Sequence, residues 1–344
     1  MVKKVVLVLV LIIVAVMGYV GYLFRGQYAA AKSVHLVAAG IYTLTYEGDY
    51  GFDDFLAQGG ASSTAEMADY ITSFLTHGLV KARMTPQSYG CSSITATDST
   101  GTVCTGRNFD WPEKMSDIVV VHALPTNGYA SVSTCAIQFL GFGEDWKPEG
   151  IQNQMSLLAS VYAPLDGMNE KGLYVASLVA GDTLMINQRT DRPDLTTAAA
   201  TRLLLDKAAT TDEAISLLSQ YDIHSDIHYA LHLAISDAAG KSVVIEWVDN
   251  EMLVADTPLC TNHYLAESCR KGQSMFLEDS SRRYQLMEQQ LQQHPNLSEA
   301  DITASIRQVA SADVTRWTVV FNHQALTATY YQWADFSQPY KTGI

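Results

Sequence analysis

Basic residues are scarce in this chain of 344 residues, in which 22 Lys and Arg are outnumbered by 36 Asp and Glu. The formal net charge at pH 7 is −14, and no stretch forms the basic patch that nucleic-acid-binding proteins carry. A charge of this sign favours solubility and says little about a substrate. We therefore expect no nucleic-acid partner.

The chain also lacks a complete set of metal ligands. His224, His228 and His232 are spaced four residues apart and would share one face of a helix. However, residues 229–236 follow an alternating pattern that ends at a turn, which is typical of a strand. No carboxylate or cysteine completes a convincing ligand set around these histidines. We therefore expect neither a metal ion nor another cofactor.

Cysteines are few. The five are Cys91, Cys104, Cys135, Cys260 and Cys269. None follows the apolar amino-terminal run closely, which argues against lipidation there. Cys260 and Cys269 flank a loop and are the first pair to test if the compartment permits disulfides. Cys104 and Cys135 lie inside strand-like runs, where we expect buried thiols.

Residues 5–24 are all uncharged and mostly apolar, and Lys3 and Lys4 precede them. This run is long enough to span a bilayer and longer than the apolar region of an ordinary signal peptide. A small-residue cleavage site at residues 29–31 lies far from its most apolar part. We therefore expect a transmembrane anchor over residues 1–24, with a cleaved signal segment as the alternative.

The two lysines before this run, against Arg25 directly after it, place the amino terminus in the cytoplasm. The bulk of the chain would then lie outside the cytoplasm, in the periplasm or at the cell surface. If the run is instead a cleaved signal, the protein is secreted. Both alternatives make the main body of the protein extracytoplasmic.

The middle of the first half has the pattern of a β-hairpin. Residues 91–97 and 102–110 alternate as strands do, and the polar tetrad 98–101, which ends in glycine, is a strong turn signal. Such a turn would place Cys91 opposite Arg107 or the residue after it. The pattern leaves the register open, and a slip by one residue moves a side chain to the other face.

These residue types suit nucleophilic chemistry. A cysteine thiol has a pKa of about 8.5, and a nearby guanidinium such as that of Arg107 lowers it. Asp110 could hold that guanidinium or orient an amine. If the chain were cut between Gly90 and Cys91, the new α-amine, with a pKa of about 7.7–8.0, would be a general base for its own thiol. The alternative is a buried structural cysteine beside a surface Arg–Asp pair.

Beyond the hairpin, short apolar runs bounded by glycine, proline and asparagine predict further strands. We expect strands over residues 41–46, 117–123, 130–139, 156–163, 173–179, 230–236, 242–248, 252–255, 318–322 and 326–332. We expect helices over residues 64–77, 196–207, 280–292 and 298–310, and another that begins at residue 211. Runs of strands interrupted by pairs of helices point to an α+β fold with antiparallel sheets.

Several motifs follow one another in a characteristic order. They are Cys91, Gly-Arg-Asn-Phe-Asp at 106–110, Asp-Gly-Met-Asn-Glu-Lys-Gly-Leu at 166–173, Thr-Asn at 261–262, Ser-Arg-Arg-Tyr at 281–284 and the run from Trp317 to Tyr340. This order resembles the linear amide C–N hydrolases, the choloylglycine hydrolase and penicillin V acylase group of N-terminal-nucleophile (Ntn) enzymes. Any one motif is weak, but together and in this order they are specific.

The resemblance implies a four-layer αββα sandwich of antiparallel sheets, the Ntn-hydrolase fold, with Cys91 at the start of a central strand. It divides the chain into the anchor or signal at residues 1–24, a propeptide at residues 25–90 and a catalytic domain at residues 91–344. Residues 51–60 resemble the segment before the nucleophile in several family members. The alternative is that residues 25–90 form an amino-terminal subdomain that is never cut from Cys91.

The resemblance also implies roles in catalysis. Cys91 would be the nucleophile, and Asp110 would orient its amine. Asn262 would donate to the oxyanion, while Arg107 and Arg283 would set the local electric field. Without the resemblance, the alternatives are a buried asparagine that caps a turn and two surface arginines near a helix start.

One position departs from the family pattern. Asn169 is expected to be structural, in a turn between strands. Bile-salt-hydrolysing relatives usually carry another asparagine ten positions later, where this chain has Val179. This difference puts conjugated bile salts in doubt as the substrate.

We expect hydrolysis of a linear, non-peptide amide of an N-acylated small molecule, through a thioester on Cys91. The first alternative is acyl transfer to an amine, as in the related isopenicillin N acyltransferases. The second is a membrane-anchored, catalytically inactive binding module in which Cys91 stays uncut. The expected partners are the small N-acyl amide and, through the amino-terminal helix, a membrane, and a homo-oligomer is left open.

Overall fold

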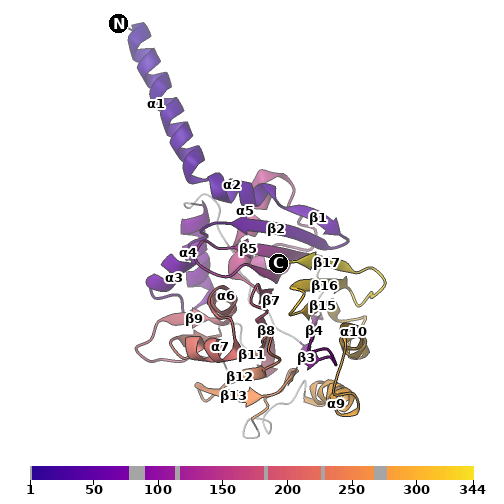
Figure 1. The fold of residues 1–344 in the computed structure, drawn as a ribbon. Helices are drawn as coiled ribbons and strands as arrows, with labels where there is room; N and C mark the ends of the chain where they lie inside the picture. The colour runs from indigo at the N-terminus through magenta and orange to yellow at the C-terminus, as the bar shows by residue number, and fades with distance from the viewer. Residues whose placement is uncertain (1, 77–89, 113–116, 182–184, 226–228, 267–276) are drawn as a thin grey trace.

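The computed structural model describes residues 2–76, 90–112, 117–181, 185–225, 229–266 and 277–344. Two β-sheets face each other in the middle of the molecule, and helices cover the outer face of each sheet (Figure 1). The layers therefore follow the order αββα. The predicted α+β class with large antiparallel sheets is confirmed.

The larger sheet has nine strands. In spatial order they are β1 (His35–Ala38), β2 (Ile41–Glu47), β5 (Ile118–Leu124), β6 (Ser131–Ala136), β7 (Asp166–Asn169), β8 (Tyr174–Gly181), β11 (Ala230–Ser236), β12 (Ser242–Val248) and β13 (Glu251–Asp256). Neighbours are antiparallel except for β2 and β5, which are parallel. Every residue of β11 is buried, because the second sheet covers one face and helices cover the other.

The smaller sheet has six strands, all antiparallel to their neighbours. In spatial order they are β14 (Leu259–Cys260), β3 (Cys91–Thr97), β4 (Val103–Asp110), β15 (Thr315–Asn322), β16 (Thr327–Gln332) and β17 (Tyr340–Gly343). The β3–β4 hairpin is confirmed, and its turn is closed by Asp98, which accepts hydrogen bonds from the backbone of Thr100 and Thr102. The apolar side chains between the two sheets form one continuous core that includes Cys91.

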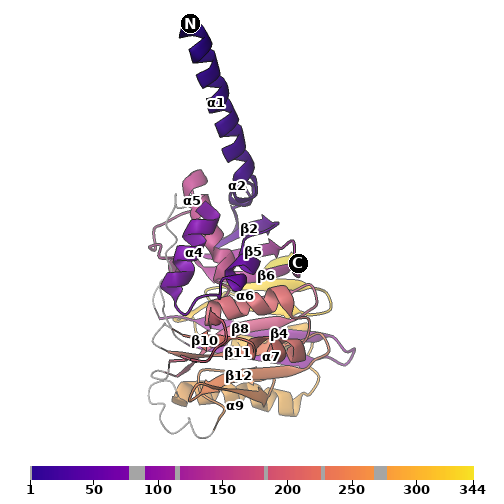
Figure 2. The ribbon, with the colours of Figure 1, turned by 90° about the vertical axis from the view of Figure 1, so that its left-hand side faces the viewer.

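Helices form the two outer layers. Those on the nine-stranded sheet are α3 (Phe52–Ala57), α4 (Thr64–Thr76), the 3-10 helix η2 (Leu157–Tyr162), α6 (Thr197–Lys207) and α7 (Thr211–Leu218). Figure 2 shows α6 and α7 in front of this sheet. Those on the six-stranded sheet are α9 (Leu277–Gln293) and α10 (Glu299–Gln308). The remaining short elements are η1 (Ile137–Leu140), α5 (Gly150–Ser156) and the parallel pair β9 (Asp194–Thr196) and β10 (Asp222–His224).

Local sequence signals explain where several helices begin. The Thr196 hydroxyl accepts from the backbone N–H of Ala199 and caps α6. Ser298 and Asp301 form a capping box at the start of α10, which satisfies two backbone donors reciprocally. The helices predicted over residues 196–207 and 298–310 are confirmed with small differences at their ends.

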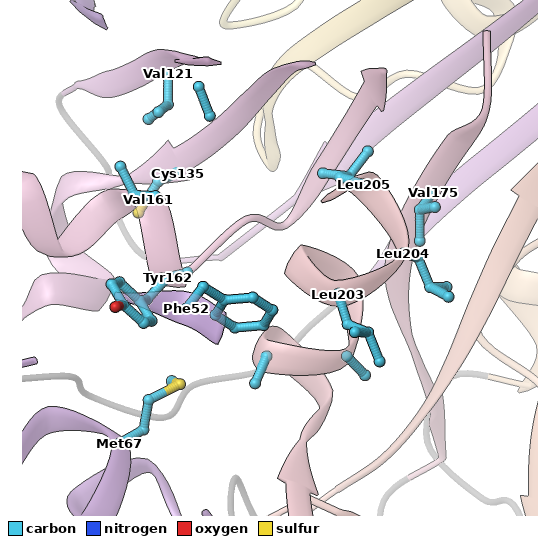
Figure 3. Close-up of a cluster of buried hydrophobic side chains, with 14 of the residues drawn as sticks. Phe52, Met67, Val121, Cys135, Val161, Tyr162, Val175, Leu203, Leu204 and Leu205 are labelled. Carbon is cyan, nitrogen blue, oxygen red and sulfur yellow. The ribbon is translucent and has the colours of Figure 1, made fainter. Parts of the chain in front are cut away.

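The outer core of the nine-stranded sheet joins distant parts of the chain. Figure 3 shows Leu203 and Leu204 of α6, Tyr162 of η2, and Phe52 and Met67 from the amino-terminal segment in one cluster. The rings of Phe52 and Tyr162 meet edge to face at 5.8 Å. Full burial of each such side chain contributes about 1.5–3 kcal/mol.

The amino-terminal segment is built into this fold. Strand β2 pairs in parallel with β5 along its whole length, from Ile41 opposite Ile118 onward. The Tyr50 hydroxyl donates to buried Asp206 at 2.6 Å, and the Tyr162 hydroxyl donates to the Tyr50 carbonyl. The predicted strand and helix within this segment are confirmed. Cleavage of the segment as a propeptide stays a prediction, and any cut would leave these contacts in place.

Helix α1 (Val2–Leu23) projects from the body, and Phe24 alone joins it to α2 (Arg25–Lys32) (Figures 1 and 2). The 18 residues Val6–Leu23 are long and apolar enough to cross a membrane, and none of this stretch is buried. A signal sequence near an amino terminus would pass the same test. The choice between anchor and signal stays open.

Three sequence predictions are corrected by the structure. Residues 137–139, expected to end the strand over residues 130–139, lie in the 3-10 helix η1. Residues 156–162 of the strand predicted over 156–163 are helical. The prediction failed because an apolar run of this length suits a buried helix as well as a strand. In the hairpin, Cys91 lies opposite Phe109, not opposite Arg107 or the residue after it. The sequence analysis also missed β17 at the sheet edge.

Candidate active site

Cys91 is the first residue of β3, and its side chain is buried between the two sheets. Because alternate residues of a strand share a face, Arg107 lies on the same face as Phe109, the residue opposite Cys91. This diagonal position lets Arg107 Nη2 approach Cys91 Sγ to 3.6 Å. The hairpin therefore brings the guanidinium to the sulfur, although by a different register from the predicted one.

Arg107 is fixed by a buried ion pair that the sequence analysis missed. Its Nη1 donates to Asp166 Oδ2, both side chains are fully buried, and its Nη2 also donates to the Ser177 carbonyl at 2.7 Å. Trp317 Nε1 donates to the same Asp166 oxygen at 3.1 Å. Burial would lower the pKa of Arg107, but Asp166, together with Cys91 and Tyr174, outweighs burial and raises the pKa. The guanidinium thus stays charged beside Cys91.

The thiol itself is not activated in the uncut chain. Burial raises the pKa of the Cys91 thiol, and the charge of Arg107 opposes this effect without cancelling it. The predicted lowering by a nearby guanidinium is therefore present but is outweighed by desolvation. A base close to the sulfur would be needed to remove its proton near neutral pH.

The peptide bond between Gly90 and Cys91 is held on both sides. The Cys91 backbone N–H donates to Asn262 Oδ1 at 2.6 Å. The Gly90 carbonyl accepts from the backbone N–H of Asp110 at 2.8 Å. A Cβ placed on Gly90 would lie 3.4 Å from the Asp110 side chain and 3.5 Å from Asn262 Oδ1. The bond predicted to be cut therefore passes through the cluster of candidate catalytic residues.

Asn262 follows β14, and its orientation is set by its partners. Its Oδ1 accepts from Arg283 Nη2 at 3.0 Å as well as from the Cys91 nitrogen, so two donors fix which end of the amide faces the nucleophile. Its Nδ2 donates to the Val179 carbonyl at 3.0 Å. In the uncut chain, Asn262 thus holds the nitrogen of Cys91, while its own donor is engaged elsewhere.

Arg283 lies on the buried face of α9 and binds the start of β3. Its Nη1 donates to the Cys91 carbonyl and to Ser92 Oγ at 2.6 Å, and its Nε donates to Asp279 at 2.8 Å. The nearest atoms of Arg283 and Asp110 are 3.8 Å apart. Arg283 therefore binds the backbone of the candidate nucleophile Cys91 from a helix of the outer layer.

Asp110 ends β4 beside Gly90. Its Oδ1 accepts from the Thr315 hydroxyl at 2.6 Å, a partner on β15 that the sequence analysis missed. Burial raises the pKa of the Asp110 carboxyl, against the opposing effects of Arg283 and Thr315. Both the carboxyl and the backbone N–H of this residue thus lie at the predicted cleavage point.

The structure brings all five predicted site residues into one buried cluster. Cys91 and Asp110 come from the ends of the hairpin, Arg107 from β4, Asn262 from the end of β14 and Arg283 from α9. The cluster lies where the six-stranded sheet meets β8 and α9. Its roles in catalysis remain predictions.

Other residues singled out in the sequence lie elsewhere. Asn169 is structural, as expected, since its side chain closes the β7–β8 turn and donates to the carbonyls of Leu205 and Ala208. Cys104 and Cys135 are buried thiols, as predicted. Cys260 is described as a buried thiol, while Cys269, its predicted partner, lies outside the described residues.

Within the parts of the chain that the structure describes, no three His, Cys, Asp or Glu residues are grouped to hold a metal ion. His224 lies on β10 and His232 on β11, and each is paired with a carboxylate. His228 lies outside the described residues. The three histidines therefore do not share the face of a helix.

Comparison with known proteins places this chain in a family. The family model of acyl-coenzyme A:6-aminopenicillanic acid acyl-transferase matches residues 97–332. The chain belongs to this family. The match contains Arg107, Asp110, Asn262 and Arg283 and begins shortly after Cys91. The resemblance to the choloylglycine hydrolase and penicillin V acylase group of Ntn enzymes is thereby confirmed.

Individual relatives agree with this family assignment. Penicillin V acylase from Pectobacterium atrosepticum is 33% identical over 99 residues, which is 26% of the length of each chain. Penicillin V acylase from Agrobacterium tumefaciens has a similar structure, with a TM-score of 0.50 and 18% identity over 73% of this chain and 84% of that one. A variant of conjugated bile acid hydrolase from Clostridium perfringens is also similar, with a TM-score of 0.54 and 15% identity. The match covers 74% of this chain and 92% of that one. The family member described here thus shares the fold of these enzymes.

Proposed function

We propose that this protein is an Ntn amidohydrolase that hydrolyses a linear amide of an N-acylated small molecule, with Cys91 as the nucleophile. The observation that carries the proposal is the position of the Gly90–Cys91 bond. Its nitrogen is held by Asn262, its carbonyl by the Asp110 backbone, and the adjacent sulfur by Arg107. Family membership and the similarity to penicillin V acylase support the same chemistry.

The first step is the release of the Cys91 amine. Cys91 Sγ attacks the Gly90 carbonyl carbon, and the backbone N–H of Asp110, 2.8 Å from the carbonyl oxygen, stabilises the negative charge that develops there. The C–N bond breaks, the Cys91 nitrogen takes the proton that the thiol gives up, and a thioester links Gly90 to the sulfur. Water then hydrolyses the thioester to leave a Gly90 carboxylate, a free thiol and a free α-amine.

The second step uses the same atoms on the substrate. The α-amine removes the thiol proton, which burial otherwise keeps in place, and the sulfur attacks the acyl carbon of the amide. Departure of Gly90 frees the Asp110 N–H to donate to the substrate oxyanion. The amine of the substrate leaves with the proton, and water hydrolyses the thioester.

Arg107, Asn262 and Arg283 hold this arrangement. Arg107 stabilises the thiolate, and its pairing with Asp166 keeps it charged. Asn262 Oδ1 accepts from the amine, which aims the remaining lone pair of the nitrogen toward the sulfur. The predicted donation from Asn262 to the oxyanion would require its Nδ2 to leave the Val179 carbonyl.

Acyl transfer is the second candidate, because the matching family model describes an acyl-transferase. The acyl-enzyme would form in the same way, and an amine rather than water would attack the thioester. Turnover in the presence of added amines separates the two activities. Formation of a new amide from the acceptor supports transfer, and release of the free acid alone supports hydrolysis.

The experiment that tests the proposal is turnover of a panel of N-acyl amides by the parent and by Cys91→Ala. We expect the parent to release the free acid and Cys91→Ala to be inactive. Cys104→Ala is the matched control, because it removes another buried thiol from the same sheet without touching the cluster. Equal turnover by the parent and Cys91→Ala would overturn the proposal that Cys91 is the nucleophile, and no turnover by either protein would favour the inactive binding module.

We also propose that α1 anchors the enzyme in a membrane with the catalytic body outside the cytoplasm. The support is the apolar length of α1 and its direct junction with α2, whose Gln27, Ala30 and Ala31 are buried in the body. We expect the full chain to sediment with membranes and to be released by detergent. Recovery of the whole protein in the soluble fraction, without α1, would show a cleaved signal instead.

A further inference from the structure

A second pair of buried titratable groups lies one layer behind the candidate active site. His232 on β11 and Glu246 on β12 are 0% and 2% exposed, and His232 Nδ1 lies 3.0 Å from Glu246 Oε1. Glu246 also accepts from the backbone N–H groups of Leu265 and Ala266, at 2.7 and 3.2 Å. These two residues follow Asn262 closely in the chain, so the pair also holds the loop that carries it.

The contacts of the His232 ring fix its orientation. His232 Nδ1 faces a carboxylate oxygen, and Nε2 faces the Val179 carbonyl oxygen at 3.1 Å. The carbonyl oxygen of Val179 can only accept, so Nε2 donates to it, and Nδ1 shares a hydrogen bond with Glu246. Burial would raise the pKa of Glu246, but His232 and the two backbone donors outweigh it and lower the pKa.

The Val179 carbonyl lies next to an irregularity in the sheet. The register between β8 and β11 shifts from Ala230 opposite Gly181 to Leu231 opposite Val179, which leaves Ala180 as an extra residue. Such bulges redirect backbone groups next to active sites. The Val179 oxygen thus accepts from both His232 Nε2, at 3.1 Å, and Asn262 Nδ2, at 3.0 Å.

The hydrogen bonds form one continuous path from the pair to the nucleophile. Glu246 binds His232, His232 and Asn262 share the Val179 oxygen, and Asn262 Oδ1 binds the Cys91 nitrogen at 2.6 Å. If His232 were lost, the Val179 carbonyl would lose one of the two side-chain donors that hold it. The amide of Asn262 could then turn with it.

We propose that His232 and Glu246 are positioning residues, which fix Val179 and Asn262 so that the Cys91 amine is aimed at its own sulfur. This inference rests on the proposed function, because it concerns the amine that cleavage after Gly90 would release. Neither residue contacts the reacting atoms. Their loss should therefore slow the chemical step and leave substrate binding unchanged.

The test compares His232→Phe and Glu246→Gln with the parent. His232→Phe keeps a ring of similar size and removes both hydrogen bonds, while Glu246→Gln keeps the shape and removes the charge. The matched control is His224→Phe, since His224 is also buried and also pairs with a carboxylate, Asp194, at 2.8 Å, but on β10. For each protein we would measure kcat, KM, the rate of Cys91 alkylation by iodoacetamide at neutral pH, and thermal unfolding.

We expect His232→Phe to lower kcat about tenfold or more, since a small misplacement of reacting groups has effects of this size. KM should change less than twofold. Glu246→Gln should lower kcat less, Cys91 alkylation should slow in both variants, and His224→Phe should resemble the parent. A folded His232→Phe protein with the kcat and alkylation rate of the parent would overturn the inference.

The remaining outcomes are also decisive. If His232→Phe does not fold, Glu246→Gln alone decides, and if neither folds, the pair is structural and the inference fails. A loss of kcat matched by an equal rise in KM would likewise contradict it. If the parent is itself uncut and inactive, the proposed function fails. If the parent is active and both variants match its kcat and alkylation rate, only the inference about His232 and Glu246 fails.

Discussion

The ion pair between Arg107 and Asp166 makes the sharpest prediction about the architecture of the site. Both side chains are fully buried, and Asp166 Oδ2 accepts from Arg107 Nη1 and Trp317 Nε1. Asp166→Asn keeps the volume and one acceptor oxygen but removes the negative charge. Arg107 would then be a buried cation without its counter-charge.

The expected cost follows from this burial. Breaking a buried ion pair by removing one partner costs about 3–5 kcal/mol, and the retained acceptor oxygen of the asparagine places the expectation at about 3 kcal/mol. For a chain of this size that loss lowers the midpoint of thermal unfolding by about 4–6 °C. Activity should also fall, because the 3.6 Å contact between Arg107 Nη2 and Cys91 Sγ depends on the same anchor.

The assay is equilibrium unfolding in urea, in detergent, with turnover measured on the same samples. Asp212→Asn is the matched control, since Asp212 pairs with Lys241 at 2.5 Å but both side chains are exposed. This control should unfold like the parent, because exposed pairs are screened by water and salt. A free energy of unfolding for Asp166→Asn within about 1 kcal/mol of the parent would refute the role given to this pair.

Three further predictions concern other parts of the chain. Tyr50→Phe removes the 2.6 Å hydrogen bond to buried Asp206 and should cost about 1.5–3 kcal/mol in urea unfolding, with faster proteolysis of the amino-terminal segment. Ser298→Ala removes the capping box of α10 and should cost about 1 kcal/mol. The pKa of Glu246 is lower in the folded protein than in the unfolded chain, so the ionised side chain stabilises the fold. This contribution to stability is fully present above the unfolded pKa of about 4.3 and is lost as the pH falls through the lowered pKa of the folded protein. The stability difference between the parent and Glu246→Gln should therefore shrink in acid, and a constant difference would contradict this.

The sequence predicted the hairpin well because its signals are local. Alternation over residues 91–97 and the turn around Asp98 suffice to place both strands. These local signals did not fix the register of the hairpin. The pairing of Cys91 with Phe109 also depends on the neighbouring strands of the sheet. For the same reason, residues 156–163 could not be assigned from their apolar composition, which suits a buried strand or a buried helix.

The five site residues were found through the motifs, and the residues that hold them were not. Asp166 is 59 positions from Arg107, and Thr315 is 205 positions from Asp110. No local pattern joins such pairs, because only the packing of the two sheets brings them together. Asp166 is the first residue of one of the motifs, and this was the available sequence signal for a role at the site. The sequence analysis did not assign a partner to its charge.

The central claim is that Cys91 becomes an amino-terminal nucleophile, and the amino terminus of the expressed protein tests it most directly. Intact mass and amino-terminal sequencing of the parent should reveal a chain that begins at Cys91, while Cys91→Ala should remain joined through Gly90. An active parent in which every molecule retains the bond between Gly90 and Cys91 would contradict the claim.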